Sequence, residues 1–156
     1  MKHRLSVLLV LLLARVFFSP EAVAQQTDTT AAPGVIPQQQ EEVRGVALEP
    51  NYPNPFSRET RVPFVLGRDQ FQDGRSVVVT VRIYNVLRQV VAIPVALDHP
   101  TASGQPVQEL RYDAPGRYLL LWDGNDMSGQ PVSSGIYFLE IIAGRSRDVG
   151  KMIVTR

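Results

Sequence analysis

Cysteine is absent from this chain of 156 residues, and its absence excludes several kinds of chemistry. Disulfides, iron–sulfur clusters, cysteine-based zinc sites and thiol catalysis all require cysteine. Lipid attachment behind a signal sequence requires it too. If the protein is exported, its fold must therefore be stabilised by burial of apolar side chains and by hydrogen bonding between strands.

Long hydrophobic runs are also scarce, because the one extended run lies at the N-terminus. Residues 5–14 are apolar or small and follow the basic Lys2 and Arg4. This run is shorter than the ~20 apolar residues that a membrane-spanning helix needs. A signal peptide is the favoured interpretation. An uncleaved anchor is the alternative, and Arg15, which interrupts the apolar stretch, is the feature that keeps it open.

The predicted signal peptide covers residues 1–24. Ala22 and Ala24 provide the small residues that a signal peptidase requires, so cleavage is expected between Ala24 and Gln25. The protein is therefore expected in the periplasm, on the cell surface or outside the cell. We find no second apolar run long enough to cross a bilayer, so the mature chain is expected to lack a membrane span.

Neither sign of charge is in clear excess. The full chain carries a formal net charge of +1, and loss of Lys2, Arg4, Arg15 and Glu21 with the signal peptide changes it to about −1. A nearly neutral chain provides no electrostatic argument for binding nucleic acid or anionic lipid.

Composition divides the mature chain into a linker and one domain. Residues 25–44 are rich in Gln, Thr, Ala and Pro and contain no aromatic residue. Such a segment buries too little apolar surface to offset its ordering entropy, so a disordered linker is predicted. Residues 45–156 alternate apolar stretches with turn residues, as all-β domains do.

Period-two alternation predicts about seven strands and no convincing helix. Val62, Phe64 and Leu66 share one face of their strand, as do Tyr137, Leu139 and Ile141, which leaves Glu140 in water. Pro63 and Pro94 cannot donate to a ladder; Pro63 indicates an edge strand or a solvent-facing position, and Pro94 an edge, bulge or strand end. The predicted strands cover residues 60–66, 76–84, 87–97, 107–112, 116–122, 136–143 and 149–155.

The fold class follows from burial. Each alternating strand has one apolar face, and a sheet must cover that face. No amphipathic helix is available, so a second sheet must cover it. The prediction is an all-β, Ig-like antiparallel β-sandwich.

Three ordered blocks of residues resemble one family. They are Asn51, Tyr52, Pro53, Asn54, Pro55 and Phe56; Tyr84 and Asn85; and Trp122, Asp123, Gly124, Gly129, Ser134, Gly135, Tyr137 and Lys151. Their order and spacing resemble the type A C-terminal sorting domains of type IX secretion substrates. They are similar, more distantly, to the Ig-like domain of the flagellar hook-capping protein. The resemblance covers residues 45–156.

The resemblance implies structural roles for these residues and a function in protein secretion or cell-surface attachment. Tyr52 and Phe56 are expected to anchor a stiff proline-containing segment in the core, and Trp122 is expected to point inward. The chain departs from the family at Ser57 and Arg58, at Arg88 where glycine is usual, and in the longer region 93–114. Only residues 25–44 lie between the predicted cleavage site and the domain, so either the module acts alone or the sequence is a fragment.

Candidate reactive groups are few, so no catalytic residue and no enzymatic activity are predicted. His99, the one histidine after the signal peptide, is expected in a solvated loop. The serines lack a nucleophile motif, and the carboxylates do not converge by spacing for glycoside hydrolysis. These residues are Ser103, Ser128, Ser133 and Ser134, and Glu109, Asp113 and Glu140.

Two binding possibilities remain from the sequence. Asp123, Asn125 and Asp126 are oxygen ligands of the kind that calcium favours, although capped turns are the preferred interpretation. Tyr52, Phe56, Tyr84 and Tyr112 could form an aromatic patch for a sugar or a protein. For Tyr52 and Phe56 the core interpretation is stronger; Tyr84 and Tyr112 stay open.

Two functional hypotheses lead from this sequence. The first is a sorting or anchoring module that secretion machinery recognises as a folded surface. The second is a free-standing structural or adhesive domain; a small secreted enzyme is a distant third. The partner is expected to be a protein and not nucleic acid. A strand edge, that of the Pro63 strand or the last strand, could accept a partner strand.

Overall fold

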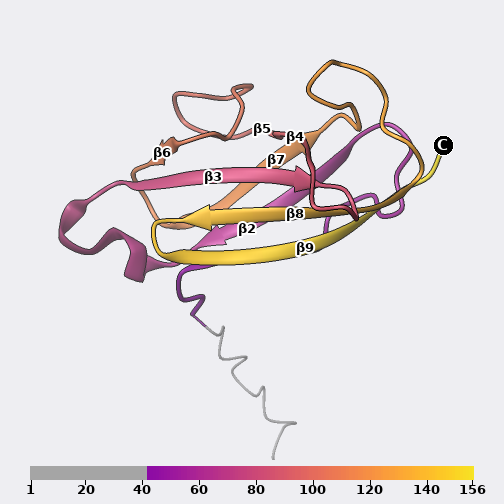
Figure 1. The fold of residues 1–156 in the computed structure, drawn as a ribbon. Coiled ribbons are helices and arrows are strands. Elements are labelled where there is room, and N and C mark those ends of the chain that lie inside the picture. Colours follow the sequence, from indigo (N-terminus) through magenta and orange to yellow (C-terminus); the bar gives the residue numbers. More distant parts are fainter. Residues whose placement is uncertain (1–41) are drawn as a thin grey trace, which may run out of the picture. The chain divides into compact units, whose positions relative to one another are not determined.

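The computed structural model describes residues 42–156, which form a sandwich of two antiparallel sheets (Figure 1). This confirms the predicted all-β class. The predicted signal peptide at residues 1–24 and residues 25–41 of the linker lie outside the described residues. Among the described residues, no helix is both long enough and apolar enough to span a membrane.

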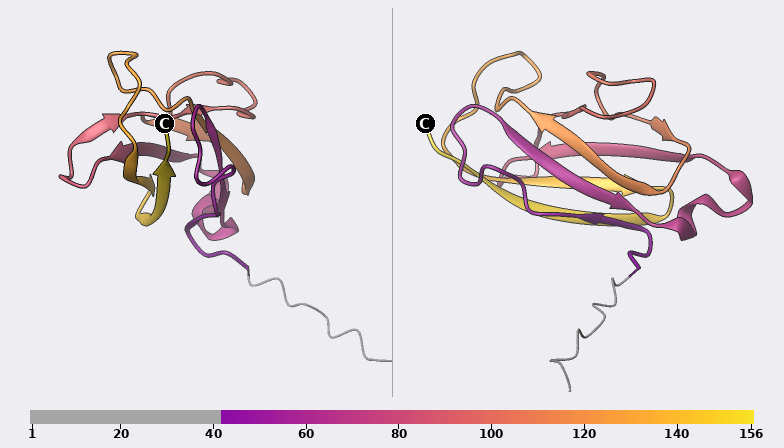
Figure 2. Two further views of the ribbon diagram at one scale, coloured as in Figure 1. Left: turned by 90° about the vertical axis from the view of Figure 1, so that its right-hand side faces the viewer. Right: turned by 180° about the vertical axis from the view of Figure 1, so that it is seen from behind.

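The first sheet has the strand order β1-β2-β7-β5, and the second has the order β4-β3-β8-β9, with β6 also paired to β3. Figure 2 shows the two layers from the side and from behind. The bounds are β1 Val46–Leu48, β2 Thr60–Leu66, β3 Val77–Tyr84, β4 Val90–Ala92, β5 Val95–Ala96, β6 Leu110–Tyr112, β7 Gly116–Trp122, β8 Gly135–Ala143 and β9 Ser146–Val154.

Two elements were not predicted, and one predicted strand is divided into two strands in the structure. Strand β1 and a short 3-10 helix, η1 (Arg68–Gly74), are additional. The stretch 87–97 divides at Pro94 into β4, which belongs to the second sheet, and β5, which belongs to the first. The proline therefore ends one strand where the chain crosses between the layers.

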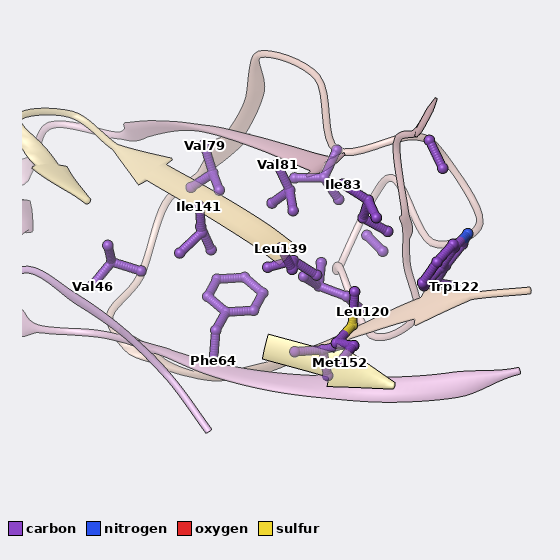
Figure 3. Packing of buried hydrophobic residues seen from close by; sticks show 14 of the residues in the cluster. Val46, Phe64, Val79, Val81, Ile83, Leu120, Trp122, Leu139, Ile141 and Met152 are labelled. Atoms are coloured by element: carbon purple, nitrogen blue, oxygen red, sulfur yellow. The ribbon is translucent and has the colours of Figure 1, made fainter. Parts of the chain in front are cut away.

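The core lies between the two sheets and includes the residues whose alternation predicted it. The inward positions of β2 and β3 are buried, as are those of β8 (Figure 3). The largest fully buried side chains include Phe64, Leu66, Ile83, Leu120, Trp122, Leu139, Ile141 and Met152. The predicted phases are therefore confirmed for these strands.

Pro63 contradicts its predicted position. Strand β2 is internal, between β1 and β7, and Pro63 is buried opposite Leu119. Its carbonyl accepts a hydrogen bond from the Glu49 amide at 2.9 Å. Its missing donor faces the side where the β1 ladder has just ended at Leu48. An internal strand tolerates Pro63 because the β1–β2 ladder ends next to it, so no ladder bond requires an amide hydrogen at this position.

Glu140 contradicts its predicted exposure, because it is buried on the outward side of β8. Tyr84 donates a hydrogen bond from its hydroxyl to Glu140 Oε2 at 2.8 Å, and Arg147 forms an ion pair with the same carboxylate. Alternation correctly placed Glu140 outside the core. Neighbouring side chains of β3 and β9 then cover it, which a single strand pattern does not predict.

One lateral side of the sandwich is closed where β1 lies against β9. The amide of Val46 donates to Ser146 Oγ at 3.0 Å, and the amide of Leu48 donates to Asp148 Oδ2 at 2.7 Å. The other carboxylate oxygen of Asp148 accepts from the Val149 amide at 2.8 Å. Polar side chains at inward positions of β9 thus satisfy amides of an edge strand that has no further strand beside it.

The opposite lateral side is closed by residues 104–112. The Val107 amide donates to the Pro94 carbonyl at 2.9 Å, and the Val107 carbonyl accepts from Val81 at 2.8 Å. Val107 therefore connects the chain entering β5 with β3 of the other sheet, and β6 pairs with the start of β3. The longer region 93–114 is thus a structural closure of the sandwich.

Candidate functional site

The three motif blocks gather at one end of the sandwich, which we call the motif end: residues 51–58, 84–89, 122–135 and 153–156. Strands β2 and β8 begin there, and β3, β7 and β9 end there (Figure 1, the side that carries the C-terminus). The register pairs Thr60 with Trp122 and Gly135 with Val154. Blocks that are distant in sequence therefore meet because antiparallel strands place starts beside ends.

Trp122 is the centre of this end. Its ring makes edge contacts with Phe56 and with Tyr137, with centroids 5.3 Å apart in each case. Its indole N–H donates to the Asn125 carbonyl at 2.9 Å. The buried Trp122 thereby fixes both the Phe56 segment and the turn that follows β7, as its predicted inward position requires.

Tyr137 stays a neutral hydrogen-bond donor in this setting. Its hydroxyl donates to the Ser133 carbonyl at 2.8 Å. Burial raises the pKa of Tyr137, and the positive charge of Arg156 opposes that rise. The tyrosine holds the segment that leads into β8.

Gly124 is the tightest point of the motif end. Its φ is +71°, and a Cβ there would lie 2.6 Å from the Arg58 carbonyl oxygen and 3.0 Å from the Arg156 guanidinium. That guanidinium donates to the Gly124 carbonyl at 2.7 Å. The Arg156 amide donates to Ser134 Oγ at 2.8 Å. Arg156 therefore links the Trp122–Gly124 turn to the start of β8.

The first block is held by a polar core of its own. Asn51 is buried, and its side-chain amide donates to Thr60 Oγ1 at 2.9 Å and to the Pro53 carbonyl at 3.1 Å. Thr60 donates to the same carbonyl at 2.8 Å. The peptide bonds before Pro53 and Pro55 are cis. The hydrogen bonds of Asn51 and Thr60 hold the segment that leads to Phe56.

Tyr52 is not the core anchor that was predicted, because 79% of its surface is exposed. Its backbone pairs with Arg61 through two hydrogen bonds of 2.9 Å. In this extended pairing the ring points away from the sandwich, whereas Phe56 is buried against Trp122 as predicted. The aromatic anchor of this block is Phe56 alone.

The first block also covers the edge of the last strand. Asn54 Oδ1 accepts from the Ile153 amide at 3.0 Å, and the Phe56 amide donates to the Ile153 carbonyl at 3.0 Å. The Thr155 amide returns a bond to the Phe56 carbonyl at 2.8 Å. These bonds cover the C-terminal end of the β9 edge, and β2 is internal and has no open edge. Lys151, of the third block, is exposed on the outward side of β9.

The second block forms a tight hairpin between β3 and β4. Asn85 Oδ1 accepts from the amides of Leu87 and Gln89, both at 3.0 Å. Arg88 adopts φ +63°, the left-handed region that glycine favours. Its guanidinium lies 5.6 Å from the centre of the Tyr84 ring. The hairpin thus holds an arginine in a backbone conformation that glycine adopts more readily.

The acidic residues after Trp122 cap turns. Asp123 accepts from the Asn125 backbone and side-chain amides at 3.0 and 2.9 Å. Asp126 Oδ1 accepts from the amides of Ser128 and Gln130 at 2.8 and 2.9 Å, and Gly129 completes that turn at φ +76°. Within residues 42–156, no three His, Asp or Glu side chains are grouped as metal ligands. Calcium binding at Asp123, Asn125 and Asp126 stays the weaker of the two hypotheses from the sequence.

His99 is buried, so the predicted solvated loop position is wrong. Its Nδ1 accepts from the Thr101 and Ala102 amides at 3.2 and 3.1 Å, and its Nε2 lies 2.6 Å from the Arg111 carbonyl oxygen. The hydrogen-bonding partners of this histidine are backbone groups. The structure therefore gives it the role of organising region 93–114.

The other candidate reactive groups do not converge. Ser103 bonds to the Leu97 carbonyl and Ser134 to Arg156, while Ser128 and Ser133 are exposed. Glu109 and Asp113 are exposed, and Glu140 is covered by Tyr84 and Arg147. The proposed aromatic patch is also wrong, because Phe56 and Tyr112 are buried.

A hollow of about 410 Å³ adjoins the motif end between the β4–β5 crossover and the turn after β7. Its lining includes the apolar Ile93, Val95 and Trp122 and the polar Asp123, Asn125 and Asp126. The Asp126 oxygen already accepts two turn amides. The hollow therefore provides shape but no convergent reactive groups.

Sequence reasoning missed residues that close this end and the adjacent side. Arg156 carried no signal, because its partners, the Gly124 carbonyl and the Ser134 hydroxyl, lie in turns that are distant in sequence. Ser146 and Asp148 did carry one: both are polar at positions in phase with the buried Met152 and Val154. A polar residue at an inward position near a sheet edge indicates a strand partner that needs an acceptor.

Comparisons with known proteins add little. No family model and no curated protein matches the chain. Among solved structures it is similar to dimeric latent PorU from Porphyromonas gingivalis, with a TM-score of 0.46 and 17% identity over 72% of this chain. The match spans 10% of that protein's chain. A likeness at this level identifies no family and no activity.

Proposed function

We propose that residues 45–156 form a non-enzymatic recognition module of an exported protein, which secretion machinery reads as a folded surface. The module acts in protein secretion or in attachment to the cell surface. Its resemblance to type A sorting domains suggests the type IX system. Within residues 42–156, the candidate reactive groups lie apart from one another, and the motif end supplies a packed surface.

The observation that carries the proposal is the assembly of the motif blocks at one end. Trp122 contacts the first block through Phe56 and the third through Tyr137. Arg156 bonds the Gly124 turn and Ser134. Residues that resemble the family motif thus hold one compact surface in place, which favours recognition of that end as a unit.

Export of a reporter tests the proposal. Residues 25–156 are fused behind a periplasmic reporter in a host that has a type IX system, and reporter activity outside the cells is measured. We expect external reporter in the intact host and periplasmic reporter when the secretion system is deleted. Periplasmic retention in both hosts contradicts the sorting function.

Two glycines provide matched variants. Gly124 and Gly129 have φ values of +71° and +76°, but a Cβ at Gly129 meets nothing within 4 Å. Alanine costs about 1 kcal/mol of backbone strain at either position, so Gly124→Ala differs by its clash with Arg58 and Arg156. We expect Gly124→Ala to lower export well below that of Gly129→Ala. Arg156→Ala, which leaves the backbone unstrained, should lower export in the same direction.

A free-standing structural or adhesive domain of the periplasm or surface is the second candidate. The closure of both lateral sides favours it, since such a domain is stable without a partner strand. It predicts reporter retention together with a purified domain that melts cooperatively. Reporter export by the secretion system would decide against it.

A further inference from the structure

The two sheets present different surfaces to solvent. Apolar side chains are exposed on the outward positions of the second sheet, where Ile136 and Val149 are each 44% exposed. Val78 and Val90 belong to the same face by their register with Arg111 and Tyr84. On the first sheet the outward apolar residues are at most half-exposed: Val65, Val95, Leu119 and Leu121.

The same face of the second sheet is also strongly cationic. The outward positions of β3, β6, β8 and β9 include one acidic residue, Glu140, and it is buried and paired with Arg147. Glu109 lies at the rim, where its amide bonds to Thr80 Oγ1 at 3.1 Å. The basic side chains on this face are Arg82, Arg111, Arg147 and Lys151, with Arg88 over the Tyr84 ring.

The positive charge is a property of this face and not of the whole protein, because the predicted mature chain is nearly neutral. Of the other acidic residues near these strands, Asp148 bonds a β1 amide on the inward side, Asp123 and Asp126 cap turns, and Asp113, which follows β6, is exposed. Since Glu140 neutralises only one arginine, the face keeps an excess of positive charge. A complementary partner must supply negative charge and apolar contact area.

We propose that this outward face, formed by β3, β6, β8 and β9, is a docking surface for an acidic protein. Its residues favour a protein partner over an anionic polymer. Arginine and aromatic residues are enriched in protein interfaces, whereas lysine is depleted. Here arginines outnumber the single lysine, and Tyr84 and Phe138 lie between them on adjacent strands. The proposal rests on the proposed recognition function and adds to the motif end a second surface that binds a partner.

Site-specific photo-crosslinking tests the docking surface. A benzophenone amino acid replaces Val149 in the full chain, and Arg68, exposed in η1 and outside both this face and the motif end, is the control position. The protein is irradiated with envelope extract of its own source. We expect a peptide-containing adduct from position 149 that is absent from position 68 and is lost at high salt. Adducts equal at both positions, or none, would overturn the proposal.

Charge-reversal variants then test whether electrostatic attraction drives the binding. Lys151→Glu with Arg111→Glu removes positive charge from the face, and Arg61→Glu with Arg68→Glu makes the same change in net charge elsewhere. The adducted protein is purified and titrated against each form. We expect at least tenfold weaker binding for the first pair and less than twofold for the second, with melting temperatures unchanged. Equal effects, or an adduct of lipid or polysaccharide alone, would refute an acidic protein partner.

The reporter assay separates the two proposals. If the Lys151 and Arg111 reversals abolish the adduct but export continues, the face docks a partner that is not the exporter. If export fails in the wild-type fusion while the adduct persists, the docking surface stands and the sorting function does not.

Discussion

Two aromatic clusters support this sandwich, and they differ in how the sequence encodes them. The motif cluster, Phe56, Trp122 and Tyr137, is built from residues of the recognisable blocks. The insert cluster joins His99 and Tyr112, from the longer region 93–114, to Phe64 and Tyr118. His99 and Tyr112 lie 4.6 Å apart by ring centroids, closer than any pair of the motif cluster.

The comparison shows that the region without a motif is integrated as firmly as the region with one. Val107 is fully buried and bonds to both sheets, and His99 binds three backbone groups. A long loop between strands can therefore be part of the core. Its packing is encoded by scattered residues, so a motif search overlooks it.

The strongest way to break this comparison is to truncate one ring in each cluster. Trp122→Ala and Phe64→Ala should each lower the free energy of unfolding by ~3–5 kcal/mol, because both side chains are buried. Urea denaturation monitored by circular dichroism measures both. A loss below about 1 kcal/mol for Phe64→Ala alone would show that the insert cluster is peripheral.

The next effect isolates polar bonding in the insert cluster. His99→Leu leaves the Thr101 and Ala102 amides and the Arg111 carbonyl without their partner, and each unsatisfied buried group costs ~1–3 kcal/mol. We expect a loss of about 2–4 kcal/mol after partial hydration of the loop. Thr101→Ala, at an exposed side chain, should change stability by less than about 0.5 kcal/mol. Equal losses in the two variants would contradict the assigned role of the ring.

A smaller effect should appear at alkaline pH, and the insert cluster should dominate it. Burial, with a further contribution from Asp98, raises the pKa of Tyr112 and of Tyr118 in the folded state. The unfolded chain ionises these phenols near pH ~10, so it binds fewer protons there than the folded chain. The contribution of these phenols to the free energy of unfolding is therefore fully present below pH ~10 and is lost as the pH rises above it.

Melting temperatures between pH 8 and pH 11.5 measure this loss. Tyr112→Phe should flatten the alkaline decline relative to the wild type. Tyr137→Phe should flatten it less, because Arg156 partly opposes the raised pKa of Tyr137. An identical decline in all three proteins would remove the tyrosines as its cause.

The smallest effect is expected for Tyr52, which is compared with Phe56 of the same block. Tyr52→Ala should change the free energy of unfolding by less than about 0.5 kcal/mol, because its ring is exposed. Phe56→Ala, from the same block, should cost ~3–5 kcal/mol. A large loss on truncation of Tyr52 would mean that its ring packs in solution.

Much of the fold could be predicted from alternation alone. The predicted strand at residues 60–66 has the observed bounds of β2, and the inward phases of β3 and β8 are correct. These features depend on one strand at a time, since period two defines which face is apolar. Of the site, the motif residues were predicted, whereas the contacts of Arg156 that link them were not.

The failures concern relations between strands. Pro63 was assigned to an edge because its missing amide was known, whereas the end of the neighbouring ladder was not. Glu140 was assigned to water although Tyr84 and Arg147 cover it from adjacent strands. Tyr52 was expected in the core and is exposed, whereas His99 was expected in water and is buried. Both predictions failed for the same reason, because chain crossings and loops determine the neighbours of these residues.

The bonds between residues 46–56 and residues 146–155 have a consequence for the order of events in folding. The Val46 and Leu48 amides bond to side chains 100 residues further along, and the Ile153 amide bonds to a side chain 99 residues earlier. Contacts of such sequence separation form late, because a long loop must close before they contribute. A chain that is synthesised from its amino end therefore cannot complete the bonding of β1 until residues 146–148 have been added.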